Sequence, residues 1–388
     1  MKKKIVILGS TGSIGQNTLK IVKANNRDFS IELLSTNKNI TKILNQAKKF
    51  KVKNIIINDF KKYLEAKHKT RNKNLRIYNN FDEIDKILKY KKVYYSMIAI
   101  SGLEGLKPTL KLTKYSKNLA VVNKESLICG WSLIKKNLNK YKTNFIPLDS
   151  EHFSIFSLLN DNKTNLVDKI YITASGGPFI NFPKKRFNKI KPKDALKHPN
   201  WKMGKKITVD SATLMNKVFE VIEAKNIFDL DYKNISILTH PKSYIHAIIK
   251  FKNGLTKILA HDPDMKIPIY NSIYESNGEN IKINPLDLNI LNNLELKKVD
   301  IKKFPLIKLL KKLPSHSSLY ETILITINDY LVFKFLDNSI NFQKLIDLII
   351  QISNFKEFQK FKKIKPKNVD DIYLLRDYVS LKLDSLGI

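Results

Sequence analysis

Cysteine and long hydrophobic runs are scarce in this chain of 388 residues. The single cysteine, Cys129, excludes a disulfide within the chain and a cysteine-rich zinc site. No run of about 18 apolar residues occurs, so we expect no membrane-spanning helix and no membrane partner. The apolar run Ile5–Leu8 is too short for the core of a signal peptide. These absences lead us to expect a protein of the reducing cytoplasm.

Arginine is also rare, although the formal net charge is +35. Only five of the 70 basic residues are arginine, the side chain that best recognises phosphates and bases through paired hydrogen bonds. The lysines are spread along the whole chain, as codon drift in an AT-rich genome would spread them. We therefore expect no nucleic-acid partner, although such a charge would steer anionic small substrates. A nucleic-acid-binding protein remains the alternative outside enzymes.

Short apolar runs alternate with segments of helical periodicity over residues 1–149, with 43% hydrophobic residues in the whole chain. Such repeated βα units predict an α/β fold with a doubly wound, Rossmann-like parallel sheet. We expect strands at Lys4–Leu8, Ile31–Ser35, Asn54–Ile57, Leu75–Tyr78, Val93–Ile100, Leu119–Val122 and Asn144–Pro147, and helices at Ile14–Lys23 and Phe81–Leu88, among others.

The pattern changes after Asp149 to that of an α+β catalytic domain, expected over residues 150–274. The dipeptide Asn253-Gly254 predicts a hairpin between Ile245–Phe251 and Thr256–Ala260. Residues 275–300 are expected to form a linker, and residues 301–388 a helical domain. Further expected elements are strands at Ile170–Thr173 and Ile235–Thr239, one long helix at Ser211–Phe228 capped by Asp210 or Ser211, and helices at Leu306–Leu313, Leu319–Leu336, Phe342–Phe355 and Asp370–Leu386.

A glycine-rich turn, Gly9–Gly15, joins the first expected strand to the first expected helix. Its glycines at every third position allow a tight turn and a close approach to a pyrophosphate, which the helix N-terminus attracts. An NAD enzyme typically carries an acidic residue at the end of the second strand. This chain has Asn37, Lys38 and Asn39 there, and Lys38 would attract a 2′-phosphate. We therefore expect NADPH rather than NADH.

Three carboxylates form a candidate metal site. Asp149 and Glu151 lie at the end of an expected strand, where ligands bind in open α/β sheets. Glu220 could supply a third carboxylate from its helix. Oxygen ligands without cysteine or clustered histidine suit Mg²⁺ or Mn²⁺ rather than zinc.

A candidate phosphate site involves Thr173–Phe179, which ends a strand with small, hydroxyl-bearing and glycine residues. Ser211 is expected at a helix start, where a phosphate would also be bound. Asn216, Lys217 and Glu220 share one side of that helix. The loop from His198 to Gly204, within a candidate lid over residues 195–205, carries Trp201, which would either close over the substrate or anchor the loop.

These motifs together resemble the 1-deoxy-D-xylulose 5-phosphate reductoisomerase family. The resemblance spans essentially the whole chain in order, and its most specific block is HPNWKMGKKITVDSATLMN. The chain departs from the family at Ile325–Asp329, where a small-residue, NAANE-like helix often stands. The segments that carry the resemblance are Gly9–Gly15, Asn123–Leu127, Leu148–His152, Ser175–Phe179 and His198–Asn216.

The resemblance implies a role for each matching residue, although a glycine commonly stands at the position of Asn37. Cofactor contacts are implied for Thr11, Gly12, Ser13 and Ile14 at the NADPH pyrophosphate, for Asn37, Lys38 and Asn39 at its 2′-phosphate, and for Asn123, Glu125 and Gly204 elsewhere. Substrate contacts are implied for Lys124, Ser150, Glu151, Ser175, His198, Trp201, Ser211, Asn216, Lys217 and Glu220, with Met203 also on the lid. Catalytic roles are implied for Lys124 and for the metal ligands Asp149, Glu151 and Glu220.

The implied reaction is the NADPH- and divalent-metal-dependent isomerisation and reduction of 1-deoxy-D-xylulose 5-phosphate to 2-C-methyl-D-erythritol 4-phosphate, in the non-mevalonate isoprenoid pathway. The family also implies a homodimer. The alternative is another NADPH-dependent sugar-phosphate or semialdehyde reductase. A semialdehyde dehydrogenase would need an activated cysteine, and Cys129 stands among apolar neighbours.

Overall fold

The computed structural model describes residues 2–388 except 26, 71, 90, 160–163, 275–280 and 282. The chain divides into two compact units. The first comprises Met1–Ser126, Leu133–Asp149 and Met265–Ile281, and the second comprises Leu127–Ser132, Ser150–Asp264 and Lys282–Ile388. The expected division into three domains and a linker stays a proposal. It shares with the two units a boundary after Asp149, but it assigns residues 265–274 to the second domain.

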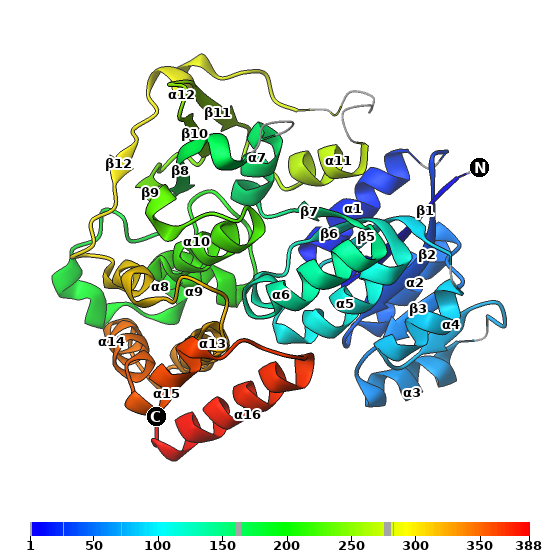
Figure 1. Cartoon of the computed structure of the whole chain (residues 1–388). Helices are drawn as coiled ribbons and strands as arrows, with labels where there is room; N and C mark the ends of the chain where they lie inside the picture. The colour runs from blue at the N-terminus through cyan, green and yellow to red at the C-terminus, as the bar shows by residue number, and fades with distance from the viewer. Residues whose placement is uncertain are drawn as a thin grey trace. The chain divides into compact units, whose positions relative to one another are not determined.

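The first unit is built on a seven-stranded, fully parallel sheet with the order β4-β3-β2-β1-β5-β6-β7 (Figure 1). The expected α/β fold with a doubly wound parallel sheet is thereby confirmed. The strands β3 and β5 and the last four residues of β1 are almost wholly buried, as strands covered on both faces should be. The strands are β1 (Lys3–Leu8), β2 (Phe29–Thr36), β3 (Asn54–Ile57), β4 (Arg76–Tyr78), β5 (Val93–Ile98), β6 (Ser116–Val121) and β7 (Asn144–Pro147).

Helices connect these strands, and side chains cap several of their N-termini. Asn39 accepts a hydrogen bond from the backbone of Lys42, Asp59 from Lys62, and Asn123 from Ser126. The helices are α1 (Ser13–Ala24), α2 (Ile40–Phe50), α3 (Phe60–Lys69), α4 (Ile84–Leu88), α5 (Leu106–Tyr115), α6 (Lys124–Tyr141), of which residues 127–132 belong to the second unit, and α11 (Lys266–Tyr274), with 3₁₀ turns η1 (Phe81–Glu83) and η2 (Leu103–Gly105).

The second unit contains a five-stranded mixed sheet with the order β11-β10-β8-β9-β12. Only β8 and β9 run parallel, and the other pairs are antiparallel. The expected hairpin is present, because β10 and β11 pair around Gly254, whose φ of +90° needs glycine. The strands are β8 (Val167–Ala174), β9 (Ile235–Thr239), β10 (Ile245–Phe251), β11 (Thr256–Ala260) and β12 (Lys297–Lys298).

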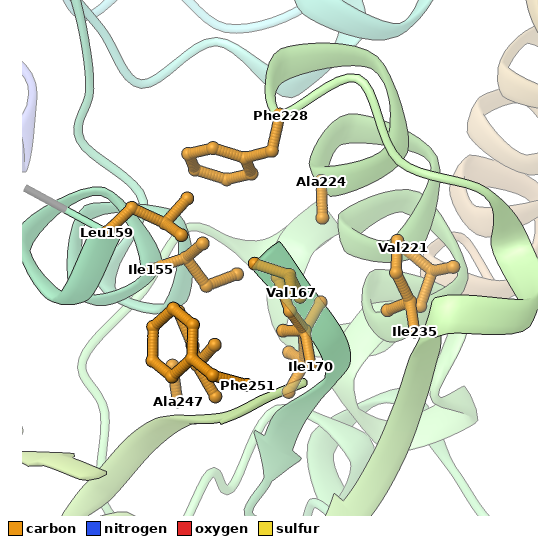
Figure 2. Packing of buried hydrophobic residues seen from close by; sticks show 12 residues of the cluster. Ile155, Leu159, Val167, Ile170, Val221, Ala224, Phe228, Ile235, Ala247 and Phe251 are labelled. Carbon is orange, nitrogen blue, oxygen red and sulfur yellow. The ribbon is translucent and has the colours of Figure 1, made fainter. Parts of the chain in front are cut away.

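The core of this sheet lies under helices α7 (Ser150–Leu159) and α10 (Met215–Ile227). Figure 2 shows Ile155 and Leu159 of α7 beside Ile170 of β8, with Val221 and Ala224 of α10 on the same cluster. Burying such side chains contributes about 25 cal/mol per Å² of apolar surface. This packing fixes α7 against α10, the helices that carry Glu151 and Glu220.

In the second unit, α13 (Tyr320–Leu336) packs against α14 (Phe342–Ser353) and α16 (Val369–Ser385). Over the part of the chain that the structure describes, no helix combines the length and apolarity needed to cross a membrane. The others are α8 (Pro192–Ala195), α9 (Lys205–Thr213), α12 (Leu288–Asn292) and α15 (Lys356–Gln359), with 3₁₀ turns η3 (Thr164–Leu166), η4 (Lys184–Lys189), η5 (Tyr232–Asn234), η6 (Pro305–Lys312) and η7 (Lys360–Lys363).

The expected long helix at Ser211–Phe228 is wrong. The chain forms two helices, α9 and α10, which Leu214 separates with a φ of +60°. Helical periodicity runs through the break without glycine or proline, so local sequence does not reveal it. Leu214 is 1% exposed and packs with Ala174 and Phe304, and this packing holds the left-handed residue in place.

One smaller expectation also needs correction. The helix expected at Leu306–Leu313 has a tighter form, because its residues up to Lys312 belong to the 3₁₀ segment η6. The expected linker, residues 275–300, lies partly outside the described residues, but it includes α12 and the strand β12, which pairs with β9. Pairing with the sheet, rather than the polar composition of this segment, decides its structure.

Candidate active site

The glycine-rich turn lies between β1 and α1, as expected. Gly9 has a φ of +80°, and a Cβ there would lie 2.3 Å from the carbonyl oxygen of Ala99. A Cβ at Gly15 would lie 2.5 Å from Cα of Ser10, so helix and turn touch through backbone. Gly12 is the N-cap of α1, and no side chain among the described residues caps it. The first N–H groups of α1 are therefore oriented for an anion.

The end of β2 contacts this turn through two side-chain hydroxyls. The Gly9 N–H donates to Ser35 Oγ over 2.9 Å, and the hydroxyls of Thr11 and Thr36 are 2.7 Å apart. The next residues, Asn37, Lys38 and Asn39, are exposed, as a 2′-phosphate site requires. Asn39 also caps α2, so part of its side chain is already engaged.

Lys38 has an acidic neighbour that sequence reasoning missed. Its Nζ is 3.8 Å from Oδ2 of Asp59, the residue that caps α3. Asp59 follows β3, and the carboxyl ends of neighbouring parallel strands lie at one edge of a sheet, which is the signal that could have indicated it. An exposed pair at this distance is weak, so Lys38 keeps its charge available to a phosphate.

Lys124 and Asp149 meet at the ends of the paired strands β6 and β7. Lys124 is the first residue of α6, and its buried Nζ forms an ion pair with Asp149 Oδ2. Asn123 is committed to the fold: its Nδ2 donates to the carbonyl oxygens of Ile100 and Gly102, and its Oδ1 caps α6. Any cofactor contact by Asn123 therefore has to share this amide. Glu125 is half-buried in the first turn of α6.

Lys217 lies between two carboxylates in the second unit. Its Nζ contacts Glu220 Oε2 at 2.5 Å and also Glu151 Oε1. The Glu220 side chain is 1% exposed and accepts a further hydrogen bond from Asn216 Nδ2. Ser150 Oγ donates to Glu151 Oε2 over 2.5 Å. The expected common side for Asn216, Lys217 and Glu220 is therefore present.

The two carboxylates and Lys217 leave a formal charge of minus one in a buried place, which favours a further cation. Asp149 immediately precedes the second unit, so the backbone itself holds it near Glu151. One oxygen each of Asp149, Glu151 and Glu220 lie within 4.8 Å of one another. Hard oxygen donors of this kind fit Mg²⁺ or Mn²⁺.

His152 joins the two helices that carry these carboxylates. Its Nε2 lies 2.9 Å from the backbone oxygen of Glu220, and its Nδ1 is 3.8 Å from Glu223 Oε2. Both side chains are about 1% exposed. Sequence reasoning gave His152 no role and missed Glu223, which follows Asn216 and Glu220 at the helical spacing i, i+4, i+7.

Ser175 and His198 also meet. His198 Nδ1 accepts the backbone N–H groups of Asn200 and Trp201, so in the neutral ring its proton lies on Nε2, 3.1 Å from Ser175 Oγ. Burial and the charge of Lys217 lower the pKa of His198 to about 4, so the ring is neutral at pH 7. Ser175 Oγ therefore accepts from His198 and from the Gly177 N–H, and its own proton can point to an anion.

Ser211 is not at a helix start. It lies in the last turn of α9, and the helix N-terminus near it belongs to α10, where Asn216 and Lys217 are the second and third residues. A Cβ at Gly177 would lie 2.9 Å from the backbone oxygen of Ser211, so the turn after β8 and the end of α9 touch. The helix N-terminus that can attract a phosphate is therefore that of α10, and not a helix start at Ser211.

The loop from His198 to Gly204 is non-helical, as expected, and it is held at several points. Asn200 Nδ2 donates to Pro241 O over 2.6 Å, and Trp201 packs edge-on against His246 with centroids 6.1 Å apart. His246 stacks on His261, a pair that sequence reasoning missed; a histidine inside the apolar strand β10 was the available signal. Trp201 and Met203 are half-buried, and Lys202 and Gly204 are exposed.

A dinucleotide-type turn and three carboxylates that could hold a metal ion are the features of metal-dependent oxidoreductases of the Rossmann class. Models of 1-deoxy-D-xylulose 5-phosphate reductoisomerase match residues 5–130, and models of its C-terminal domain match residues 145–228 and 261–379. The chain belongs to the 1-deoxy-D-xylulose 5-phosphate reductoisomerase family.

Similar proteins cover the full length. The protein of that name from Pelagibacter ubique is 56% identical over 387 residues, with 100% of both chains covered. The one from Sulfurihydrogenibium sp. is 38% identical, covering 96% of this chain and 95% of its own. A crystal structure of a reductoisomerase in complex with NADPH, fosmidomycin and magnesium superposes with a TM-score of 0.89 at 28% identity, covering 99% of both chains. The Zymomonas mobilis enzyme in complex with NADPH gives 0.88 at 27% identity, covering 100% of this chain and 99% of its own.

Proposed function

We infer that this chain catalyses the NADPH- and divalent-metal-dependent isomerisation and reduction of 1-deoxy-D-xylulose 5-phosphate to 2-C-methyl-D-erythritol 4-phosphate. The observation that carries this inference is the 56% identity over the full length to a protein of that activity. When bound, NADPH supplies the hydride, and the divalent cation polarises substrate oxygens and stabilises developing negative charge. The non-mevalonate isoprenoid pathway is the setting that the reaction implies.

The glycine-rich turn is the proposed cofactor site in the first unit. The backbone of Thr11–Ile14 binds the pyrophosphate, because the first N–H groups of α1 point outward. Lys38 and its exposed neighbours Asn37 and Asn39 bind the 2′-phosphate, which selects NADPH over NADH. Asn123, Glu125 and Gly204 are proposed to make the remaining cofactor contacts.

The carboxylates are the proposed metal ligands. Asp149, Glu151 and Glu220 hold the divalent cation, and Lys124 and Ser150 orient substrate hydroxyls beside them. Lys124 is kept in place by Asp149, which restricts the long side chain before the substrate arrives.

The phosphate is proposed to bind between the turn after β8 and the start of α10. Ser175 donates its hydroxyl proton, since its oxygen already accepts two hydrogen bonds. Ser211, Asn216 and Lys217 supply further donors, and His198 orients Ser175. Hydrogen bonds to the phosphate provide binding energy away from the reacting carbons.

The loop bearing Trp201 and Met203 is the proposed lid. The Trp201 ring lies edge-on to His246, a contact that a small loop movement could exchange for contact with substrate. A closed loop would keep water from reactive intermediates.

Measuring NADPH consumption with 1-deoxy-D-xylulose 5-phosphate tests the function. We expect turnover in the presence of Mn²⁺ or Mg²⁺, loss of turnover after chelation, and a clear preference for NADPH over NADH. Metal-independent turnover, or no turnover with this substrate, would overturn the assignment. A homodimer and a cytoplasmic location are further proposals that rest on the family resemblance, and sedimentation with cell fractionation would test them.

The semialdehyde alternative has little support. Its chemistry needs an accessible, activated thiolate, and Cys129 is 3% exposed in the middle of α6.

A further inference from the structure

A buried carboxylate lies one residue before Ser211. Asp210 is 1% exposed, and its Oδ1 accepts a hydrogen bond of 2.8 Å from Asn328 Nδ2 of α13. Its Oδ2 is 3.0 Å from Nζ of Lys206, one turn earlier on α9. The same ammonium reaches Asp329 Oδ1 of α13 at 2.8 Å. Two consecutive residues of α13 therefore contact α9, Asn328 at Asp210 and Asp329 at Lys206.

This polar cluster fixes the register of α9 on α13, because the residues around it are apolar. Ile325, Ile327 and Leu331 of α13 are almost fully buried, and apolar contacts are non-directional, so they define the register of one helix on another less sharply than hydrogen bonds do. A buried carboxylate that leaves its partners is costly, so hydrogen-bonded pairs hold one register. We call Lys206, Asp210, Asn328 and Asp329 the α9–α13 clamp.

The clamp lies where a shift would reach the substrate site. Asp210 and Ser211 share the last turn of α9, and Gly177 packs on the backbone of Ser211 with no room for a Cβ. Leu214 then turns the chain into α10, which carries Lys217. Movement of the α9 turn would therefore displace the phosphate donors on both sides of Leu214.

We propose that Asn328 and Asp329 are positioning residues for the substrate phosphate, because the α9–α13 clamp fixes the turn that carries Ser211. This role rests on the function proposed above. It gives the C-terminal helices a part in substrate binding, since α13 determines the position of the last turn of α9. Substitutions that break the clamp should therefore raise KM for the substrate more than they lower kcat.

The test uses a charge exchange within the clamp. Asn328→Asp sets two carboxylates against each other, and kcat/KM for 1-deoxy-D-xylulose 5-phosphate should fall on the order of 10-fold or more, mainly through KM. The double variant Asp210→Asn/Asn328→Asp restores one carboxylate and one amide. The amide introduced on α9 can donate to the carboxylate introduced on α13, while its oxygen accepts from the Lys206 ammonium. The double variant should therefore recover most of the loss.

The phosphate dependence separates positioning from general damage. Turnover of 1-deoxy-D-xylulose, which has no phosphate, should fall much less in Asn328→Asp than turnover of the phosphorylated substrate. Asn328→Ala removes the donor without adding charge and should show the same pattern more weakly, which keeps the test open if Asn328→Asp folds poorly.

Tyr330→Phe is the matched control on the same helix. It removes a 2.8 Å hydrogen bond from Tyr330 Oη to Asp384 on α16, away from α9, and should keep the wild-type KM. Equal losses on both substrates, no loss at all, or no recovery in the double variant would overturn the clamp proposal. If the unaltered chain itself fails to turn over the phosphorylated substrate, the proposed function fails instead.

Discussion

Lys217 acts as an internal counterion for the carboxylates Glu151 and Glu220. All three side chains are no more than 12% exposed, so their charges are poorly screened by water. Breaking a buried pair by removing one partner is strongly destabilising, whereas the intact pair contributes little. The same lysine therefore limits repulsion in the metal-free protein and leaves the negative charge that attracts a divalent cation.

Replacing Lys217 with methionine should lower the stability of the metal-free protein by about 3 kcal/mol, because two buried carboxylates lose their partner. Added Mn²⁺ should then raise Tm by more than it does in the unaltered protein, since the cation replaces the missing charge. Thermal unfolding with and without Mn²⁺ measures this. Lys250→Met is the control, because its pair with Asp168 is about half exposed. Equal Mn²⁺ effects in the two variants would contradict the counterion role.

His198 makes stability depend on pH. Its pKa is lowered to about 4 in the folded protein by burial and by the charge of Lys217, against about 6.5 in an unfolded chain. The unfolded state therefore binds a proton first as pH falls, and stability contributed by the neutral ring is present above pH 6.5 and lost towards pH 4.

We expect the free energy of unfolding in urea to fall more between pH 6.5 and pH 4.5 in the unaltered protein than in His198→Gln, which keeps a donor near Ser175. His68→Gln is the control, since that side chain is exposed on α3. A slope that His198→Gln leaves unchanged would show that other groups cause the pH dependence.

At the scale of elements, the break between α9 and α10 arranges the phosphate site. Leu214 has a φ of +60°, a conformation that costs a non-glycine residue about 1 kcal/mol or more. Its side chain is buried against Ala174 and Phe304, and this packing offsets the cost. The break turns α10 so that its first residues, rather than Ser211, supply the helix N-terminus.

At position 214, the glycine variant should be more stable than the alanine variant, which reverses their usual order of stability in a helix. Within a helix, alanine is more stable than glycine by about 1 kcal/mol. At a φ of +60°, Leu214→Gly should be more stable than Leu214→Ala by about 0.5–1 kcal/mol, although both lose the packing of leucine. Urea unfolding of the two variants measures the difference. The same pair at Val218, inside α10, should show the ordinary order; finding that order at 214 as well would refute a left-handed requirement.

At the scale of the whole molecule, the net charge of +35 acts on an anionic substrate. A field of this size raises the local concentration of anions, and salt screens it over about 8–10 Å at physiological ionic strength. Apart from the buried Lys124 and Lys217, the lysines that the structure describes are partly or fully exposed in both units, so folding places no strong demand on them.

With saturating NADPH, kcat/KM for 1-deoxy-D-xylulose 5-phosphate should fall several-fold as NaCl rises from about 0.02 to 0.3 M. The uncharged analogue 1-deoxy-D-xylulose should show little change, because it feels no net attraction. Initial rates at low substrate concentration measure both. Parallel salt dependence for the two substrates would locate the effect in the enzyme rather than in steering.

Much of the fold follows from local sequence. The buried strands of both sheets, the Asn253-Gly254 hairpin and the glycine turn after β1 are short-range features, because pleat, turn and helix-start geometry depend on neighbouring residues. The candidate carboxylates could also be predicted, since Asp149 and Glu151 follow a strand and Glu220 shares a helix side with Lys217.

Tertiary contacts decided the rest. Packing of Leu214 against Phe304 breaks a segment that is helical in pattern, and pairing with β9 makes a strand of Lys297–Lys298. The grip of Asn328 on Asp210 joins residues 118 positions apart. Such contacts stabilise the fold only after distant segments of the chain have come together. The entropy lost in closing the long loops between them is offset by burial of the whole core. No local pattern encodes which distant buried polar groups will face each other, so the pairing of Asp210 with Asn328 and of Lys217 with Glu151 became visible only in the folded chain.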